Sequence, residues 1–107
     1  MRTPVVAGNW KMNGNLASIE RLLDEVLGRL AELALQHCQV MVFPSYVYLP
    51  EVRERLRHTE VRVGAQDVDH RQPGAVTGAV SASMLSDLGC THVIAGHSER
   101  QIGRAHV

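Results

Sequence analysis

The chain has few aromatic residues and no excess of charge of either sign. Aromatic side chains make up 4% of its 107 residues and apolar ones 45%, so the core must be built of aliphatic side chains. No stretch approaches the roughly 20 consecutive apolar residues of a membrane span. Eleven basic and eleven acidic residues cancel. This balance argues against partners such as nucleic acid or an anionic membrane, because both select a basic surface.

Cysteine is scarce as well, and the two cysteines, Cys38 and Cys90, lie far apart without metal-ligand spacing. We expect small buried thiols in a reducing compartment, and no metal site. The N-terminus lacks the apolar core of a signal peptide, so the sequence predicts a cytoplasmic protein. The length suits a single domain over residues 1–107.

Short apolar runs alternate with amphipathic segments along the whole chain. Strands are predicted at Val5–Gly8, Gln39–Phe43, Val61–Ala65 and His92–Ala95. Helices are predicted from about Leu16 to about Ala34, from Pro50 onward, and from Ser81 as N-cap to Leu88. This β-α-β-α-β-α-β order predicts an α/β fold with a parallel sheet and right-handed crossovers.

The pattern also predicts which side chains are buried. The first strand is a continuous apolar run and should be covered on both faces. The first helix should turn one stripe inward, and Gly28 in it would allow close packing on a strand. The members of that stripe are Ile19, Leu22, Leu23, Val26, Leu30 and Leu33. In the third helix, Met84, Leu85 and Leu88 should face inward, with Gly89 ending the helix.

Polar side chains follow three of the predicted strands. They are Asn9 and Lys11, then Gln66 and Asp67, then His97 and Glu99. In parallel α/β sheets, sites form where the carboxyl ends of the strands meet. We therefore expect the first and the last pair to converge on one small anionic substrate. Taken singly, each fits a plainer interpretation, such as a polar strand exit or a helix-capping glutamate.

A long connection separates the third strand from the third helix. It runs over residues 68–78, whereas such connections usually have about 2–6 residues. Long loops in compact domains usually have a function, and this one could reach a partner subunit.

Four blocks of the sequence, taken together and in order, resemble the triosephosphate isomerase family. They are AGNWKMN at 7–13, GAQD at 64–67, GAVTG at 74–78 with SASML at 81–85, and GHSER at 96–100. The resemblance covers residues 4 to about 100, and the tail 101–107 does not match. It implies a (β/α)₈ barrel, of which this chain supplies four strands and the three helices between them.

The resemblance also implies an activity. The family interconverts dihydroxyacetone phosphate and D-glyceraldehyde 3-phosphate through an enediol(ate), in glycolysis and gluconeogenesis. It works as a homodimer without metal or cofactor, so a small phosphorylated triose and a second copy of the chain are the implied partners.

Carried over by position, the resemblance implies roles for single residues. Asn9 would bind the substrate, and Lys11 would hold its negative charge. His97 would polarise the carbonyl oxygen as a neutral electrophile, with Ser98 and Glu99 in support. The dimer interface would include Thr77, at the tip of the long loop, together with Met12 and Gln66.

The chain also departs from the family pattern. The family's general base is a glutamate on the loop after the sixth strand, and no residue here matches it. Ala79 stands where the family usually has a glutamate that pairs with the arginine matching Arg100, and Gln101 stands where a second arginine is common. We therefore expect the isolated chain to be inactive. The alternative is a non-catalytic truncated half-barrel that self-associates.

Overall fold

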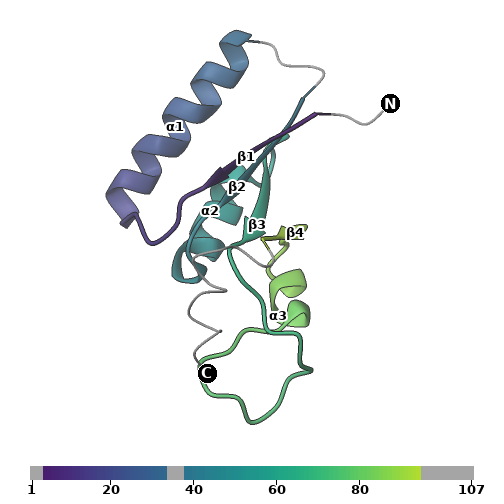
Figure 1. Ribbon diagram of the computed structural model, residues 1–107. Coiled ribbons are helices and arrows are strands. Elements are labelled where there is room, and N and C mark those ends of the chain that lie inside the picture. Colours follow the sequence, from purple (N-terminus) through teal and green to yellow (C-terminus); the bar gives the residue numbers. More distant parts are fainter. Residues whose placement is uncertain (1–3, 34–37, 95–107) are drawn as a thin grey trace.

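The computed structural model describes residues 4–33 and 38–94, which form one parallel sheet with helices packed against it (Figure 1). The elements are β1 (Val5–Asn9), α1 (Leu16–Leu33), β2 (Gln39–Phe43), the 3₁₀ helix η1 (Tyr46–Tyr48), α2 (Leu49–Leu56), β3 (Arg62–Ala65), α3 (Ala82–Asp87) and β4 (His92–Val93). The sheet order is β1-β2-β3-β4 and every neighbouring pair is parallel. The α/β alternation predicted from the sequence is confirmed.

The strands are staggered along the sheet. Val5 opens β1 opposite Gln39, the first residue of β2. Arg62, the first residue of β3, pairs with Met41, the third residue of β2. His92 then opens β4 opposite Gly64, the third residue of β3. A stagger between neighbouring strands is what closing a sheet into a barrel requires.

The hydrophobic core lies between one face of the sheet and the helices. It contains Ile19 and Leu23 of α1, Leu49, Val52 and Leu56 of α2, Val42 of β2, Val61, Val63 and Ala65 around β3, and Leu85 of α3. All are aliphatic, as the lack of aromatic residues predicts. Burial of this face positions the strands, and with them the loops at their carboxyl ends.

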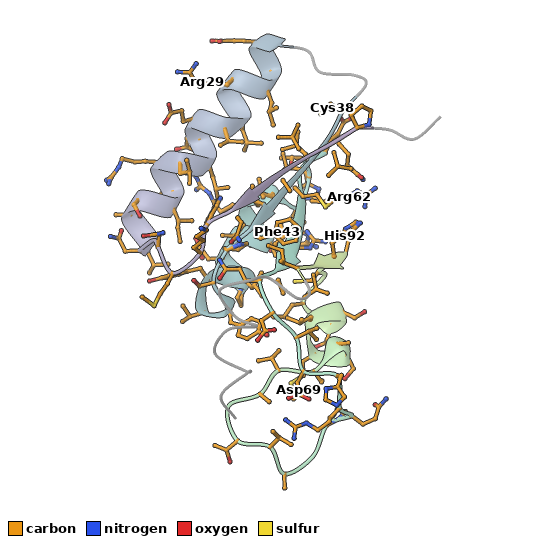
Figure 2. All side chains as sticks on the ribbon, viewed as in Figure 1. Arg29, Cys38, Phe43, Arg62, Asp69 and His92 are labelled. Atoms are coloured by element: carbon orange, nitrogen blue, oxygen red, sulfur yellow. The ribbon has the colours of Figure 1, made fainter. Side chains whose placement is uncertain are left out.

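The opposite face of the sheet carries Phe43, whose ring crosses Gly64 on the neighbouring strand. A Cβ atom built on Gly64 would overlap that ring and lie 2.7 Å from the His92 carbonyl oxygen. Glycine is therefore required where these strands approach. Phe43 lies near the middle of the sheet in Figure 2.

The prediction that β1 is covered on both faces is wrong for the described residues. The side chains of Val5 and Val6 are 50% and 56% exposed. The described residues therefore leave both faces of this strand partly uncovered, and β1 is also the edge of the sheet, paired only with β2. The apolar run describes the strand correctly but says nothing about what lies beside it.

Two predictions about α1 need correction. Leu22 is 39% exposed, because the buried face follows Ile19 and Leu23 and leaves Leu22 on the flank of the helix. A Cβ atom on Gly28 would meet nothing within 4 Å, so this glycine does not serve close packing. The side chain of Leu33 lies outside what the structure describes.

The caps of α3 are confirmed, but its inward face is narrower than predicted. The hydroxyl of Ser81 accepts a hydrogen bond from the backbone N–H of Met84 at 3.4 Å, and Gly89 follows the helix with φ +88°. Leu85 is buried, whereas Met84 and Leu88 are 48% and 38% exposed. A helix of six residues buries only one of the three side chains.

The ends of three strands also differ from prediction, since β1 extends one residue further, to Asn9. β3 begins at Arg62, and β4 ends at Val93, although the backbone N–H of Ile94 still donates to the Ala65 carbonyl at 2.9 Å. Ala95 lies outside the described residues.

The cysteines are free thiols but only half-buried, which corrects the expectation of full burial. Burial raises the pKa of Cys90, partly opposed by the nearby Arg53 guanidinium. Within residues 4–33 and 38–94, no group of three or more histidine, cysteine or acidic side chains could hold a metal ion. In the same part of the chain, no helix combines the length and apolar character needed to cross a membrane.

Candidate active site

The loop after β1 is joined to the loops after β2 and β3 at the carboxyl ends of the strands. The backbone N–H of Trp10 donates to the Phe43 carbonyl at 3.1 Å. The side-chain amide of Gln66 donates to the same Phe43 carbonyl at 2.8 Å and to the Lys11 carbonyl at 2.7 Å. The ends of β1, β2 and β3, which are distant in sequence, are therefore hydrogen-bonded to one another at the edge of the sheet where the sequence predicts a site.

Lys11 has an unusual backbone conformation at the centre of this junction. Its φ of +54° is the only positive value at a non-glycine residue among those the structure describes. A left-handed conformation costs an ordinary residue roughly 1–2 kcal/mol. Such strain persists only where surrounding contacts hold it, and it clusters at functional sites.

Hydrogen bonds hold the Lys11 backbone on both sides. Its N–H donates to the side-chain oxygen of Asn9 at 2.9 Å. Its carbonyl oxygen accepts from Gln66 and, at 3.0 Å, from the Ser45 hydroxyl. Asn9 and Lys11, both predicted site residues, are thus in direct contact. Lys11 is exposed.

The segment between Lys11 and α1 is held by short-range contacts. The side-chain amide of Asn13 donates to the Trp10 carbonyl at 3.0 Å. Asn15 and Ser18 then exchange two hydrogen bonds, because each side-chain oxygen accepts from the other residue's backbone N–H, at 2.8 and 3.0 Å. This reciprocal arrangement resembles a capping box. It defines the helix start directly after the candidate site.

The remaining predicted site residues fall into three groups. Met12 is 93% exposed and Thr77 is exposed in the long loop, so both side chains lie on the surface. His97, Ser98 and Glu99 lie outside the described residues, and their convergence with Lys11 stays a prediction. Gln66, predicted at a dimer interface, donates to the Lys11 and Phe43 carbonyls within the chain, and its place at an interface stays a prediction.

Sequence reasoning missed two residues of this junction, Ser45 and Tyr46. The Ser45 hydroxyl reaches the Lys11 carbonyl, and the Tyr46 hydroxyl donates to the Asp67 carbonyl. Both follow Pro44 at the end of β2, so they occupy the same place relative to their strand as the polar residues after β1 and β3. Their partners lie 34 and 21 residues away, so local pattern could not identify them.

The long loop closes on itself at its base. Asp69 forms an isolated parallel bridge with Ser81, and its N–H donates to the Val80 carbonyl at 2.8 Å. The Asp69 carboxylate accepts three hydrogen bonds from Arg71, at 2.6 to 2.9 Å. These bonds hold the pKa of Asp69 well below its usual range. The loop projects beyond α3 as a closed unit, with Asp69 near its base (Figure 2).

A staggered parallel sheet whose strands alternate with helices is the architecture of the (β/α)-barrel class of proteins, whose sites lie at the carboxyl ends of the strands. Comparison with known proteins identifies the family within that class. The triosephosphate isomerase family model matches residues 4–105. The chain belongs to the triosephosphate isomerase family.

Individual relatives agree with this assignment. The chain is 45% identical to the triosephosphate isomerase of Methylococcus capsulatus over 102 residues, which is 95% of this chain and 40% of the relative. It is 47% identical to that of Coxiella burnetii over 100 residues, which is 94% of this chain and 38% of the relative. The chain therefore spans about two fifths of the length of these relatives.

A solved structure shows the same relation in three dimensions. The crystal structure of triosephosphate isomerase from Bartonella henselae superposes with a TM-score of 0.86 at 30% identity. The match covers 99% of this chain and 43% of that chain. The fold is thus the part of a (β/α)₈ barrel that the sequence predicted.

Proposed function

We propose that this chain supplies the first four strands of a triosephosphate isomerase site, which interconverts dihydroxyacetone phosphate and D-glyceraldehyde 3-phosphate. The reaction would be the glycolytic and gluconeogenic one of the family, in the cytoplasm. The observation that carries the proposal is the left-handed backbone of Lys11, which side chains from three strand exits hold in place.

The chemistry of the substrate suits this arrangement. A phosphorylated triose is a small dianion, and one ammonium group at a fixed place attracts it without filling the site. Asn9 would help to orient the substrate beside Lys11. Enolisation moves charge onto a carbonyl oxygen, which a preorganised donor stabilises. We assign that donor to His97, as a neutral imidazole, with Ser98 and Glu99 as supporting polar groups.

The proposal includes an expectation for the isolated chain. The family's general base follows the sixth strand, and no residue of this sequence matches it. Removal of a general base typically costs about 10²–10⁴-fold in rate. A polypeptide of these residues alone should therefore show little turnover, and activity should require the remaining barrel strands.

A second candidate function rests on the exposed edge of the sheet. β1 is the edge strand of the sheet, where a barrel would place another strand, and its Val5 and Val6 are 50% and 56% exposed. The chain could therefore act as a self-associating half-barrel without catalysis. The homodimer of the family is a different assembly, for which we propose Thr77, Met12 and Gln66 as interface residues.

The test is complementation. Residues 1–100 are fused to the part of the Methylococcus capsulatus relative that follows the matching position, and isomerisation of dihydroxyacetone phosphate is measured. The relative rebuilt with its own N-terminal part controls for the junction, and the isolated chain is assayed in parallel. We expect turnover by the fusion and almost none by the isolated chain. A fusion that is folded by circular dichroism but inactive would contradict the proposal.

A further inference from the structure

Ser45 occupies a position where serine normally has a local role. It precedes η1 as the N-cap residue, with the extended backbone angles φ −62° and ψ 152°. N-cap serines usually accept a hydrogen bond from a backbone N–H of the first helical turn. The Ser45 side chain makes no such bond. It donates instead to the carbonyl oxygen of Lys11, 34 residues earlier in the chain, at 3.0 Å.

The partner of this bond is the strained residue of the candidate site. The Lys11 carbonyl has two lone pairs, and the structure supplies a donor for each, Ser45 from the exit of β2 and Gln66 from the exit of β3. A rotation of this peptide group toward an ordinary backbone conformation would break both bonds. Ser45 thus gives up the usual N-cap hydrogen bond and contacts a strained residue far away in the sequence. Such departures from local capping preferences are typical of functional sites.

We propose that Ser45 is a positioning residue, whose hydroxyl holds the Lys11 carbonyl so that the lysine keeps its left-handed backbone and its ammonium group stays in one place. The structural part of this inference stands by itself. Only the consequence for binding a phosphorylated triose rests on the proposed function.

The first test follows the backbone of Lys11 in the isolated chain by NMR. A positive φ brings the amide proton close to the Hα of the same residue, and this gives a strong cross-peak. Loss of one hydrogen bond changes a conformational equilibrium about fivefold. We therefore expect Ser45→Ala to weaken the Lys11 cross-peak, as the population with ordinary φ rises by about that factor.

Two variants make this result specific. Ser45→Thr keeps the hydroxyl on a backbone conformation that threonine readily adopts, and should keep the cross-peak. Ser86→Ala, at an exposed serine of α3, should leave it unchanged. An unchanged cross-peak in Ser45→Ala would overturn the proposal. So would a cross-peak as weak in Ser45→Thr as in Ser45→Ala.

The second test uses the fused barrel and covers the case in which Ser45→Ala does not fold as an isolated chain. A displaced ammonium weakens substrate binding, so KM for dihydroxyacetone phosphate should rise about fivefold in Ser45→Ala and return in Ser45→Thr. Equal KM values for the Ser45→Ala and Ser86→Ala fusions would contradict the inference. An inactive wild-type fusion would instead contradict the proposed function, and the NMR comparison would still decide the role of Ser45.

Discussion

Lys11 combines a local energetic cost with a candidate function. Its left-handed backbone is unfavourable for a lysine, and Asn9, Ser45 and Gln66 together stabilise it. A residue chosen only for stability would be glycine, which adopts positive φ freely. Under the proposed function, the ammonium group is the reason that lysine occupies this position.

This view predicts that Lys11→Gly stabilises the fold while removing the binding group. Relief of the left-handed strain, less the extra chain entropy of glycine, should make this variant about 0.5–1 kcal/mol more stable than Lys11→Ala. Both variants lack the ammonium group, so the difference in their stability reports the backbone strain alone. Urea unfolding of the two provides the measurement. Equal stability would show that Lys11 is not strained.

The second prediction at the residue scale concerns the pKa of Asp69. The three hydrogen bonds from Arg71 stabilise the carboxylate and lower its pKa from the usual value. A lowered pKa in the folded state contributes stability that is present above the unfolded pKa of about 3.9 and is lost as the pH falls below it. Arg71→Gln should therefore raise the pKa of Asp69.

A carbon-13 NMR titration of the Asp69 carboxyl group measures this directly. The wild-type signal should stay almost constant down to about pH 3.9, where an unperturbed aspartate is half protonated. The signal in Arg71→Gln should shift as the pH falls toward about 3.9, because its Asp69 carboxyl group becomes protonated there. Arg57→Gln, which removes a guanidinium from the opposite end of the sheet, serves as control. A wild-type midpoint at the ordinary value would contradict the role of Arg71.

At the scale of elements, much of the structure could be predicted from sequence periodicity. Strand and helix positions follow from local patterns, and the caps at Ser81 and Gly89 were correct because capping is local chemistry. The burial of side chains at the flanks of the helices was not predictable in the same way. Leu22 and Met84 belong to apolar stripes, yet their exposure depends on which neighbouring element each helix meets.

The close approach of β2 and β3 leads to a prediction about glycine. A side chain at Gly64 would overlap the Phe43 ring and the His92 backbone, so Gly64→Ala should cost about 1–3 kcal/mol of stability. Gly28→Ala in α1 is the matched control, because that site is open and alanine favours a helix by up to about 1 kcal/mol. Chemical denaturation compares the two variants. A neutral Gly64→Ala would mean that the strands do not meet as described.

At the scale of the whole molecule, the family could be predicted from four motifs, but the contacts that other residues make with those motifs could not. The motifs place Asn9, Lys11 and Gln66 at one edge of the sheet, and the structure brings these three residues together. The contact from Ser45 depends on chain packing, which no motif encodes. The prediction of a single domain over the whole chain stays untested.

The exposed edge at β1 predicts self-association of the isolated chain. An unpaired strand offers its backbone groups to another copy, and a charged side chain on such a strand discourages that pairing. Sedimentation velocity should show an apparent mass that rises with concentration, and Val6→Lys should lower it. Val47→Lys, at an exposed valine of η1 away from the edge, is the control. A compact monomer at all concentrations would contradict this prediction.

The most direct test of the central claim, that this chain carries the cation of an isomerase site, is kcat/KM of the fused barrel with and without Lys11. Lys11→Met removes the charge and keeps much of the side-chain volume. By comparison with the loss of one preorganised electrostatic contact, kcat/KM should fall by about 10²–10³-fold. Arg21→Met, an exposed cation on α1, should leave it within about twofold, as expected for a surface charge. An equal kcat/KM for the two variants would show that Lys11 does not serve catalysis.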